Sequence, residues 1–145
     1  MDVLQLLKAE FRDRAADMSY LLSEDKKRDA QAMFQKLCVH IAWESQFLFP
    51  ELAAISAAGD SVLNRYMQSL QALRKQTQVC LDGDSMPSTG RELAELFLKH
   101  SLWVEEKVFP LMRQKIPTGD REDLYHVFVD AKQDIYASLI PSMVV

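Results

Sequence analysis

The chain has 145 residues, 48% of them hydrophobic and 26% charged, which is typical of one globular domain covering residues 1–145. A formal net charge of −4 disfavours nucleic acid and anionic membranes as partners, since both select basic protein surfaces. No apolar run reaches the roughly 20 residues of a membrane span, and the charges spread over residues 1–22 argue against a signal peptide, so a cytoplasmic protein is expected.

Apolar residues recur at helical spacing along most of the chain, and few glycines or prolines interrupt the pattern. No segment shows the sustained alternation of polar and apolar residues that marks a half-buried strand. The sequence therefore predicts an all-α fold, namely an up-down antiparallel four-helix bundle with a short additional C-terminal helix. The segment P-T-G-D at 117–120 is expected to separate the last two helices. In chain order, the predicted helices cover about residues 3–22, 26–57, 61–81, 90–115 and 121–140.

Capping residues mark several of the predicted helix ends. Asp2 is expected to cap the first helix, and Asp60 the third, because short polar side chains accept hydrogen bonds from the first free backbone N–H groups. The second helix is expected to end at Gly59, since glycine is favoured directly after a helix. Thr89 and Glu92 have the spacing of a capping box, which predicts the start of the fourth helix.

Two segments, HIAWESQFLFP at 40–50 and HSLWVEEKVFP at 100–110, share the pattern H-x-x-W-x-x-x-x-x-F-P. They lie 60 residues apart on the predicted second and fourth helices, so each half of the chain is interpreted as one helical hairpin. In a regular helix, Pro50 and Pro110 would each lack an N–H group and clash with the carbonyl group four residues earlier. A kink or a loosened turn is therefore predicted near each proline.

Histidine and carboxylate residues accompany both copies of this pattern. His40 and Glu44 are four residues apart, so a helix projects them from one face. His100 and Glu105 are five residues apart, about 140° around a helix axis, so they are expected to flank one groove. Facing helices of a bundle can gather such groups around metal ions. Imidazole and carboxylate together suit iron, manganese or zinc better than calcium or magnesium.

With these segments the chain resembles the hemerythrin-like family, the HHE cation-binding bundles. The resemblance rests on HIAWE with FPEL, on HSLWVEE with FPLM, and on the number, order and lengths of the predicted helices. It implies a four-helix bundle around a non-haem di-iron centre. In that family one helix supplies H-x-x-x-E, and the last supplies a histidine followed four or five residues later by Glu or Asp. The metal ligands expected from the resemblance are therefore His40, Glu44, His100 and Glu105.

The chain departs from the family's pattern on its first and third helices. Glu10-Phe11 stands where the family has a histidine, and the third helix offers Tyr66 but no histidine. In the second copy, Val104 replaces the carboxylate four residues after His100. Glu10 and Tyr66 are therefore the substitute ligand candidates on these two helices. Two imidazoles and two carboxylates are too few for a di-iron centre, although they can hold one metal ion with open positions.

Three functional hypotheses follow. In the first, the resemblance implies a protein that holds iron and binds or senses oxygen, nitric oxide or iron. In the second, the bundle is metal-free, its two histidines pair with Glu44 and Glu105, and it acts as an interaction or oligomerisation module for another protein or a second copy. In the third, an apolar ligand takes the place of the metals. The residues expected to line that pocket are Phe11, Trp43, Leu70 and Trp103.

The remaining reactive residue types favour structural roles. Cys38 and Cys80 are isolated in the sequence, which predicts two free thiols in a reducing compartment. His126 precedes Asp130 by four residues on a highly charged helix, which predicts a solvated histidine rather than a metal ligand. No nucleophile elbow, phosphate-binding glycine loop or dinucleotide fingerprint is found in the sequence, which disfavours the corresponding classes of enzyme.

Overall fold

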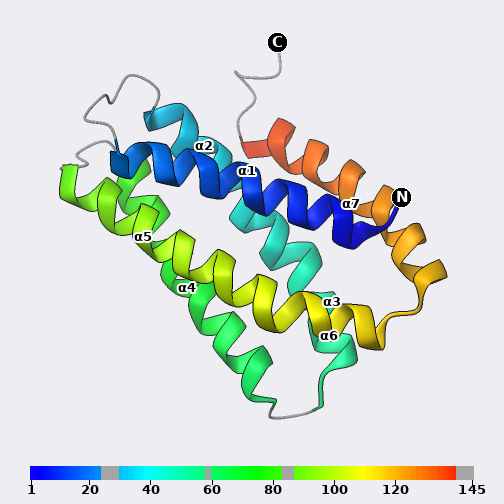
Figure 1. Ribbon diagram of the computed structural model, residues 1–145. Coiled ribbons are helices and arrows are strands. Elements are labelled where there is room, and N and C mark those ends of the chain that lie inside the picture. The colour runs from blue at the N-terminus through cyan, green and yellow to red at the C-terminus, as the bar shows by residue number, and fades with distance from the viewer. Residues whose placement is uncertain (24–29, 58–59, 83–86, 140–145) are drawn as a thin grey trace.

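The computed structural model describes residues 1–23, 30–57, 60–82 and 87–139 (Figure 1). Every regular element in these ranges is helical, which confirms the prediction of an all-α fold. None of the described helices combines the length and the apolar character that crossing a membrane requires. Three helices are regular along their whole length, and their ends agree with the predicted ones to within a few residues. These are α1 (Val3–Ser23), α4 (Ser61–Leu81) and α7 (Thr118–Leu139).

The other two predicted helices are each divided by a π turn. In chain order their parts are α2 (Ala30–Trp43), η1 (Glu44–Leu48) and α3 (Phe49–Ile55), then α5 (Pro87–Trp103), η2 (Val104–Val108) and α6 (Phe109–Lys115). The N–H of Phe49 donates to the carbonyl of Glu44, and the N–H of Phe109 to that of Val104, which is the i→i+5 bond of a π turn. Each π turn directly precedes a Phe-Pro pair and widens the helix where proline lacks its N–H group. The predicted loosened turns are thus confirmed in both copies.

Helix starts agree with the predicted caps at two of three positions. The carboxylates of Asp2 and Asp60 each accept a hydrogen bond from the backbone N–H two residues later, at 2.8 and 2.7 Å. The predicted capping box of Thr89 and Glu92 is wrong, because α5 already begins at Pro87. Proline is favoured in the first helical turn, where an N–H group has no partner inside the helix. The predicted C-terminal cap of the second helix, at residue 59, lies outside the described residues.

Four helices pack side by side in a closed circuit, that is, a ring in which each helix contacts two others. In it, α1 packs against α2 and α5, and α4 packs against the same two helices. The last helix, α7, packs against both α1 and α2 (Figure 1). Three of its side chains, Phe128, Ala131 and Ile135, are buried against the rest of the molecule. These contacts bring α7 close to the residues of α1 and α2 that carry the candidate site.

The predicted additional C-terminal helix is present as α7, but it is not short, since it has 22 residues. The segment 117–120 interrupts the helices less than expected, because α7 begins at Thr118. The guanidinium of Arg121 donates to the carbonyl groups of Arg113 and Ile116, at 3.0 and 2.8 Å. It thereby satisfies free carbonyl groups at the end of α6 and allows the next helix to begin after only two residues.

The core contains apolar side chains from both halves of the chain, including Trp43, Phe97 and Phe128. Among the described residues, a small set of polar or charged side chains is buried with them. The set is Glu10, His40, Glu44, Thr77 and His100. Burying a charged group is costly unless it is paired, so the contacts of these side chains decide what the core can do.

Candidate functional site

His40 lies on α2 and is fully buried between two carboxylates. Its Nδ1 is 2.8 Å from Oε2 of Glu10 on α1, within hydrogen-bond geometry. Its Nε2 is 2.7 Å from Oε2 of Glu44, one helical turn further along the same chain segment. The imidazole therefore connects α1 with the start of η1, and each of its ring nitrogens contacts an acid.

His100 occupies the corresponding position on α5 and contacts the same glutamate. Its Nε2 donates to Oε1 of Glu44 at 2.8 Å, and its Nδ1 is 2.6 Å from the hydroxyl oxygen of Ser69 on α4. The hydroxyl of Tyr66, one helical turn before Ser69, also donates to Oε1 of Glu44 at 2.8 Å. One carboxylate thus bridges both histidines and accepts a third contact from a tyrosine.

The outer end of this arrangement is a lysine on the last helix. The ammonium group of Lys132 donates to Oε1 of Glu10, and it lies 5.8 Å from the centre of the Trp43 ring. Arg14 approaches the same carboxylate, with its Nε 3.6 Å from Oε2 of Glu10. A continuous series of side-chain contacts therefore connects α7 with α4 through the core. We call this set the carboxylate–imidazole network; its members are Glu10, His40, Glu44, Tyr66, Ser69, His100 and Lys132.

At Glu44 and Glu10, the two acids of the network, the contacts with neighbouring charged groups together lower the pKa by more than burial raises it. Burial raises the pKa of Glu44, but His100 and His40 beside it lower that pKa from 4.5 to about 2. Burial likewise raises the pKa of Glu10, and its contacts with His40 and Lys132 lower it to about 2. Both acids are therefore carboxylates at neutral pH, and the imidazole and ammonium groups that they contact offset the cost of burying their charge.

The two carboxylates also raise the pKa values of their neighbours His40 and Tyr66. Burial lowers the pKa of His40, but Glu44 and Glu10 outweigh it, so that the pKa lies above its usual 6.5. Burial and the charge of Glu44 together raise the pKa of Tyr66 well above 10.0. Tyr66 thus stays a neutral hydrogen-bond donor to the carboxylate, while His40 is stabilised as the cation.

Phe11 fills the space beside the two histidines, where the resemblance expects a ligand from the first helix. Its ring centre lies 4.6 Å from that of His40 in an edge-to-face arrangement, and 6.1 Å from that of His100 in a stacked one. The ring also contacts Phe97 and Phe109. A phenyl ring cannot coordinate a metal, so α1 reaches the network through Glu10 instead.

Glu105, the fourth expected ligand, does not contribute to the network. Its side chain is 43% exposed and lies 3.5 Å from the guanidinium of Arg12. The residue that faces the core is its neighbour Val104, which is fully buried and occupies the position that Glu44 has in the first copy. The expected pairing of His100 with Glu105 is therefore replaced by a pairing of His100 with Glu44.

The network also contains two residues that were not predicted. Ser69 lies three residues after Tyr66, so helical spacing was a signal that both face the same side of α4. Lys132 had no such signal, because only the packing of α7 against α1 and α2 brings it to Glu10. Of the predicted site residues, the structure brings together His40, Glu44, His100, Glu10 and Tyr66.

The two tryptophans of the repeated segments have different surroundings. Trp43 is fully buried and donates through its indole N–H to the backbone carbonyl of Phe128, at 2.9 Å. Trp103 is half-buried, with the Arg65 guanidinium 5.0 Å above its ring. The third hypothesis expected both indoles to line a ligand pocket, but each of them already packs against other groups of the protein.

The donor atoms of the network do not fit a di-iron centre. Within the described ranges, no three His, Cys, Asp or Glu side chains are arranged to hold a metal ion. His100 and Tyr66 already donate to one oxygen of Glu44, and Nδ1 of His40 contacts Glu10. The Nε2 of His40 and Oε2 of Glu44 are buried and 2.7 Å apart, but neither has an aligned hydrogen-bond partner in the described structure.

Comparisons of the chain with protein-family models, with curated proteins and with solved structures found no match.

Proposed function

We propose that this chain is a hemerythrin-like four-helix bundle that works without a metal, as an interaction or oligomerisation module. The observation that carries the proposal is the bridging position of Glu44. Its carboxylate contacts both histidines and the Tyr66 hydroxyl directly, so the groups that would bind iron are used to stabilise one another. Phe11 occupies the remaining space beside the imidazoles.

The packing of the helices supports the hemerythrin-like part of the proposal. The closed circuit of α1, α2, α4 and α5 corresponds to four bundle helices, with α7 added against α1 and α2. The two H-x-x-W segments lie on α2 and α5, which both contribute a histidine to the interior. The polar groups meet in the core of this bundle, where the family resemblance expects the metal centre.

Exposed apolar side chains support the interaction part of the proposal. Leu102 on α5 is 62% exposed, and Val127 on α7 is 50% exposed. Leu102 borders a pocket of about 310 Å³ between α1 and α5, which has Phe11 and Phe109 in its wall. A leucine beside an apolar recess is a suitable anchor for a partner protein or for a second copy of this chain.

A single iron ion is the second candidate, and the buried atoms Nε2 of His40 and Oε2 of Glu44 favour it. The two atoms lie 2.7 Å from each other, and neither has an aligned hydrogen-bond partner in the described structure. Glu10 at Nδ1 holds the imidazole as carboxylates commonly do for metal-binding histidines. These two residues would hold the ion, and reduced iron would supply the affinity for oxygen or nitric oxide.

Metal analysis and thermal unfolding of the untagged protein distinguish the two candidates. For the metal-independent module we expect no stoichiometric metal and no rise in melting temperature when Fe(II) is added without oxygen, since only a ligand of the native state stabilises it. Light scattering should then show a dimer or larger assembly that Leu102→Ser weakens.

The control variant for this experiment is His126→Ala, because His126 is exposed and outside the network. Stoichiometric iron that is retained in His126→Ala and lost in His40→Ala would contradict the metal-independent module and support the single-iron site. A monomer at all concentrations, without any change in Leu102→Ser, would contradict oligomerisation.

A further inference from the structure

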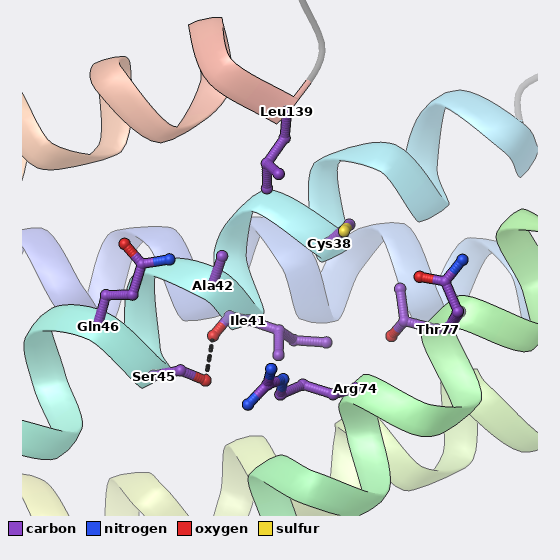
Figure 2. A pocket seen from close by; sticks show the side chains of 9 residues that line it. Cys38, Ile41, Ala42, Ser45, Gln46, Arg74, Thr77 and Leu139 are labelled. Carbon is purple, nitrogen blue, oxygen red and sulfur yellow. Dashed lines mark hydrogen bonds between the residues drawn. The ribbon is translucent and has the colours of Figure 1, made fainter.

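A pocket of about 460 Å³ lies between α2 and α4, beside the last residue of α7 (Figure 2). Its volume is within the range of natural small-molecule sites. The wall consists of residues from four elements. They are Cys38, Ile41 and Ala42 of α2, Ser45 and Gln46 of η1, Arg74, Thr77 and Gln78 of α4, and Leu139 of α7.

Among the described residues that line this pocket, Arg74 is the only charged one. Figure 2 shows its side chain reaching from α4 toward Ser45 and Ile41 on the opposite wall. Within the described part of the chain, no carboxylate forms an ion pair with this guanidinium. In a protein with a net charge of −4, a pocket whose described lining carries one positive and no negative charge is suited to an anion.

Three other polar side chains of the wall already have protein partners. The Ser45 hydroxyl donates to the carbonyl of Ile41 at 2.9 Å, and the Thr77 hydroxyl donates to that of Leu73 at 2.7 Å. The amide of Gln78 donates to Asp82 at 2.8 Å. The Arg74 guanidinium and the Gln46 amide therefore remain as donors for a bound molecule, and of these two groups only the guanidinium is charged.

The apolar part of the wall consists of Ile41, Ala42 and Leu139. Ile41 is buried, Ala42 is half-buried, and Leu139 projects from α7 above Ala42 (Figure 2). The pocket therefore has a cationic side at α4 and an apolar path along α2 toward the end of α7. A ligand that fits both needs one anionic group and a short hydrocarbon body.

We propose that this pocket binds a monocarboxylate with a short apolar chain. The carboxylate would pair with the Arg74 guanidinium, whose planar donors match two carboxylate oxygens, and the chain would lie along Ile41 and Ala42 toward Leu139. A phosphate monoester is a poorer ligand, because the described residues of the wall include no second cation for its second negative charge. A small inorganic anion would leave the apolar wall without contacts.

Titration with octanoate, followed by amide NMR spectra of the whole chain, tests this proposal. We expect saturable shifts at Cys38, Ala42 and Leu139, and a Kd that rises at least about tenfold in Arg74→Gln, which removes the charge-assisted pair. Lys75→Gln is the matched control, because it removes the same charge from the next residue of α4, an exposed one outside the pocket wall. It should leave the Kd unchanged.

Octanamide, the neutral analogue, should bind at least about tenfold more weakly than octanoate, because it cannot form the ion pair. Three results would overturn the proposal. These are no saturable shifts with octanoate at millimolar concentration, equal affinity of Arg74→Gln and the unchanged chain, or equal affinity for octanamide and octanoate. The spectra also show whether each variant is folded, so a loss of binding can be attributed to the pocket.

Discussion

The two H-x-x-W segments have the same backbone and different interiors. Both run from an α-helix through a π turn into a Phe-Pro pair, and both bury a histidine. Four residues after the histidine, however, the first copy buries Glu44 and the second buries Val104. A single acid therefore serves two imidazoles, one from each copy. Helical pattern and proline position decide the shape of such a segment, whereas one interior side chain decides its chemistry.

Replacing Glu44 by valine would make the first copy like the second, and this change should have the largest effect. It leaves the buried His40, His100 and Tyr66 without their shared acceptor, so we expect a loss of about 3–5 kcal/mol in the free energy of unfolding. Urea denaturation measures it. Glu106→Val is the control, because Glu106 is exposed and should change stability by no more than about 0.5 kcal/mol. Equal stability of the two variants would contradict an energetic role for the network.

The pH dependence of stability should also originate in the first copy and its partner Glu10. The pKa values of Glu44 and Glu10 are lowered from 4.5 to about 2, so their contribution is complete above about pH 4.5 and is lost as the pH falls toward 2. His40 has a raised pKa, so its contribution is complete below 6.5 and is lost as the pH rises through the pKa of the folded state. Urea midpoints across this range should therefore pass through a maximum.

Glu44→Gln should weaken the fall of stability in acid, because its side chain does not titrate. An acid limb as steep in Glu44→Gln as in the unchanged chain would assign that limb to other groups. The paired control is Glu105→Gln, which removes the exposed acid of the second copy. It should leave the acid limb as it is.

A smaller effect on stability is expected at Ser69 of α4, which contacts the histidine of the second copy. Ser69→Ala removes the hydroxyl partner of Nδ1 of His100 but leaves its contact with Glu44, so a loss of about 1 kcal/mol is expected from one hydrogen bond. Thermal unfolding measures it against Ser101→Ala, since the Ser101 side chain has no hydrogen bond among the described residues. No difference between the two variants would mean that Glu44 alone determines the position of His100.

The smallest effects on stability should come from changing Pro50 and Pro110, the prolines that the two copies share. Each proline lies in the first turn of α3 or α6, where its fixed φ angle is already helical. Pro50→Ala and Pro110→Ala should therefore each destabilise by about 0.4–1 kcal/mol, mainly by giving the unfolded chain more freedom. Chemical denaturation of both variants tests whether the copies respond alike. A large loss in only one copy would show that its π turn has a separate role.

Local patterns were sufficient for most of the helices. Apolar spacing predicted α4 at residues 61–81, and short polar residues predicted the caps at Asp2 and Asp60. The Phe-Pro pairs predicted two loosened turns, because the missing N–H group of proline acts on its own helix. The predicted start of α5 failed at Thr89, since Pro87 also begins a helix well and the two signals compete within three residues.

The sequence by itself determined the features that depend on interactions between residues close together in the chain. These are the helices, most of their caps, the π turns, and the pairing of His40 with Glu44 on one helical face. Tertiary structure decided which groups from other helices complete the network. Lys132 reaches Glu10 only because α7 packs against α1, and His100 turns to Glu44 because the core position beside it holds Val104 and not Glu105. Buried charges require partners, and those partners come from wherever packing brings a suitable side chain.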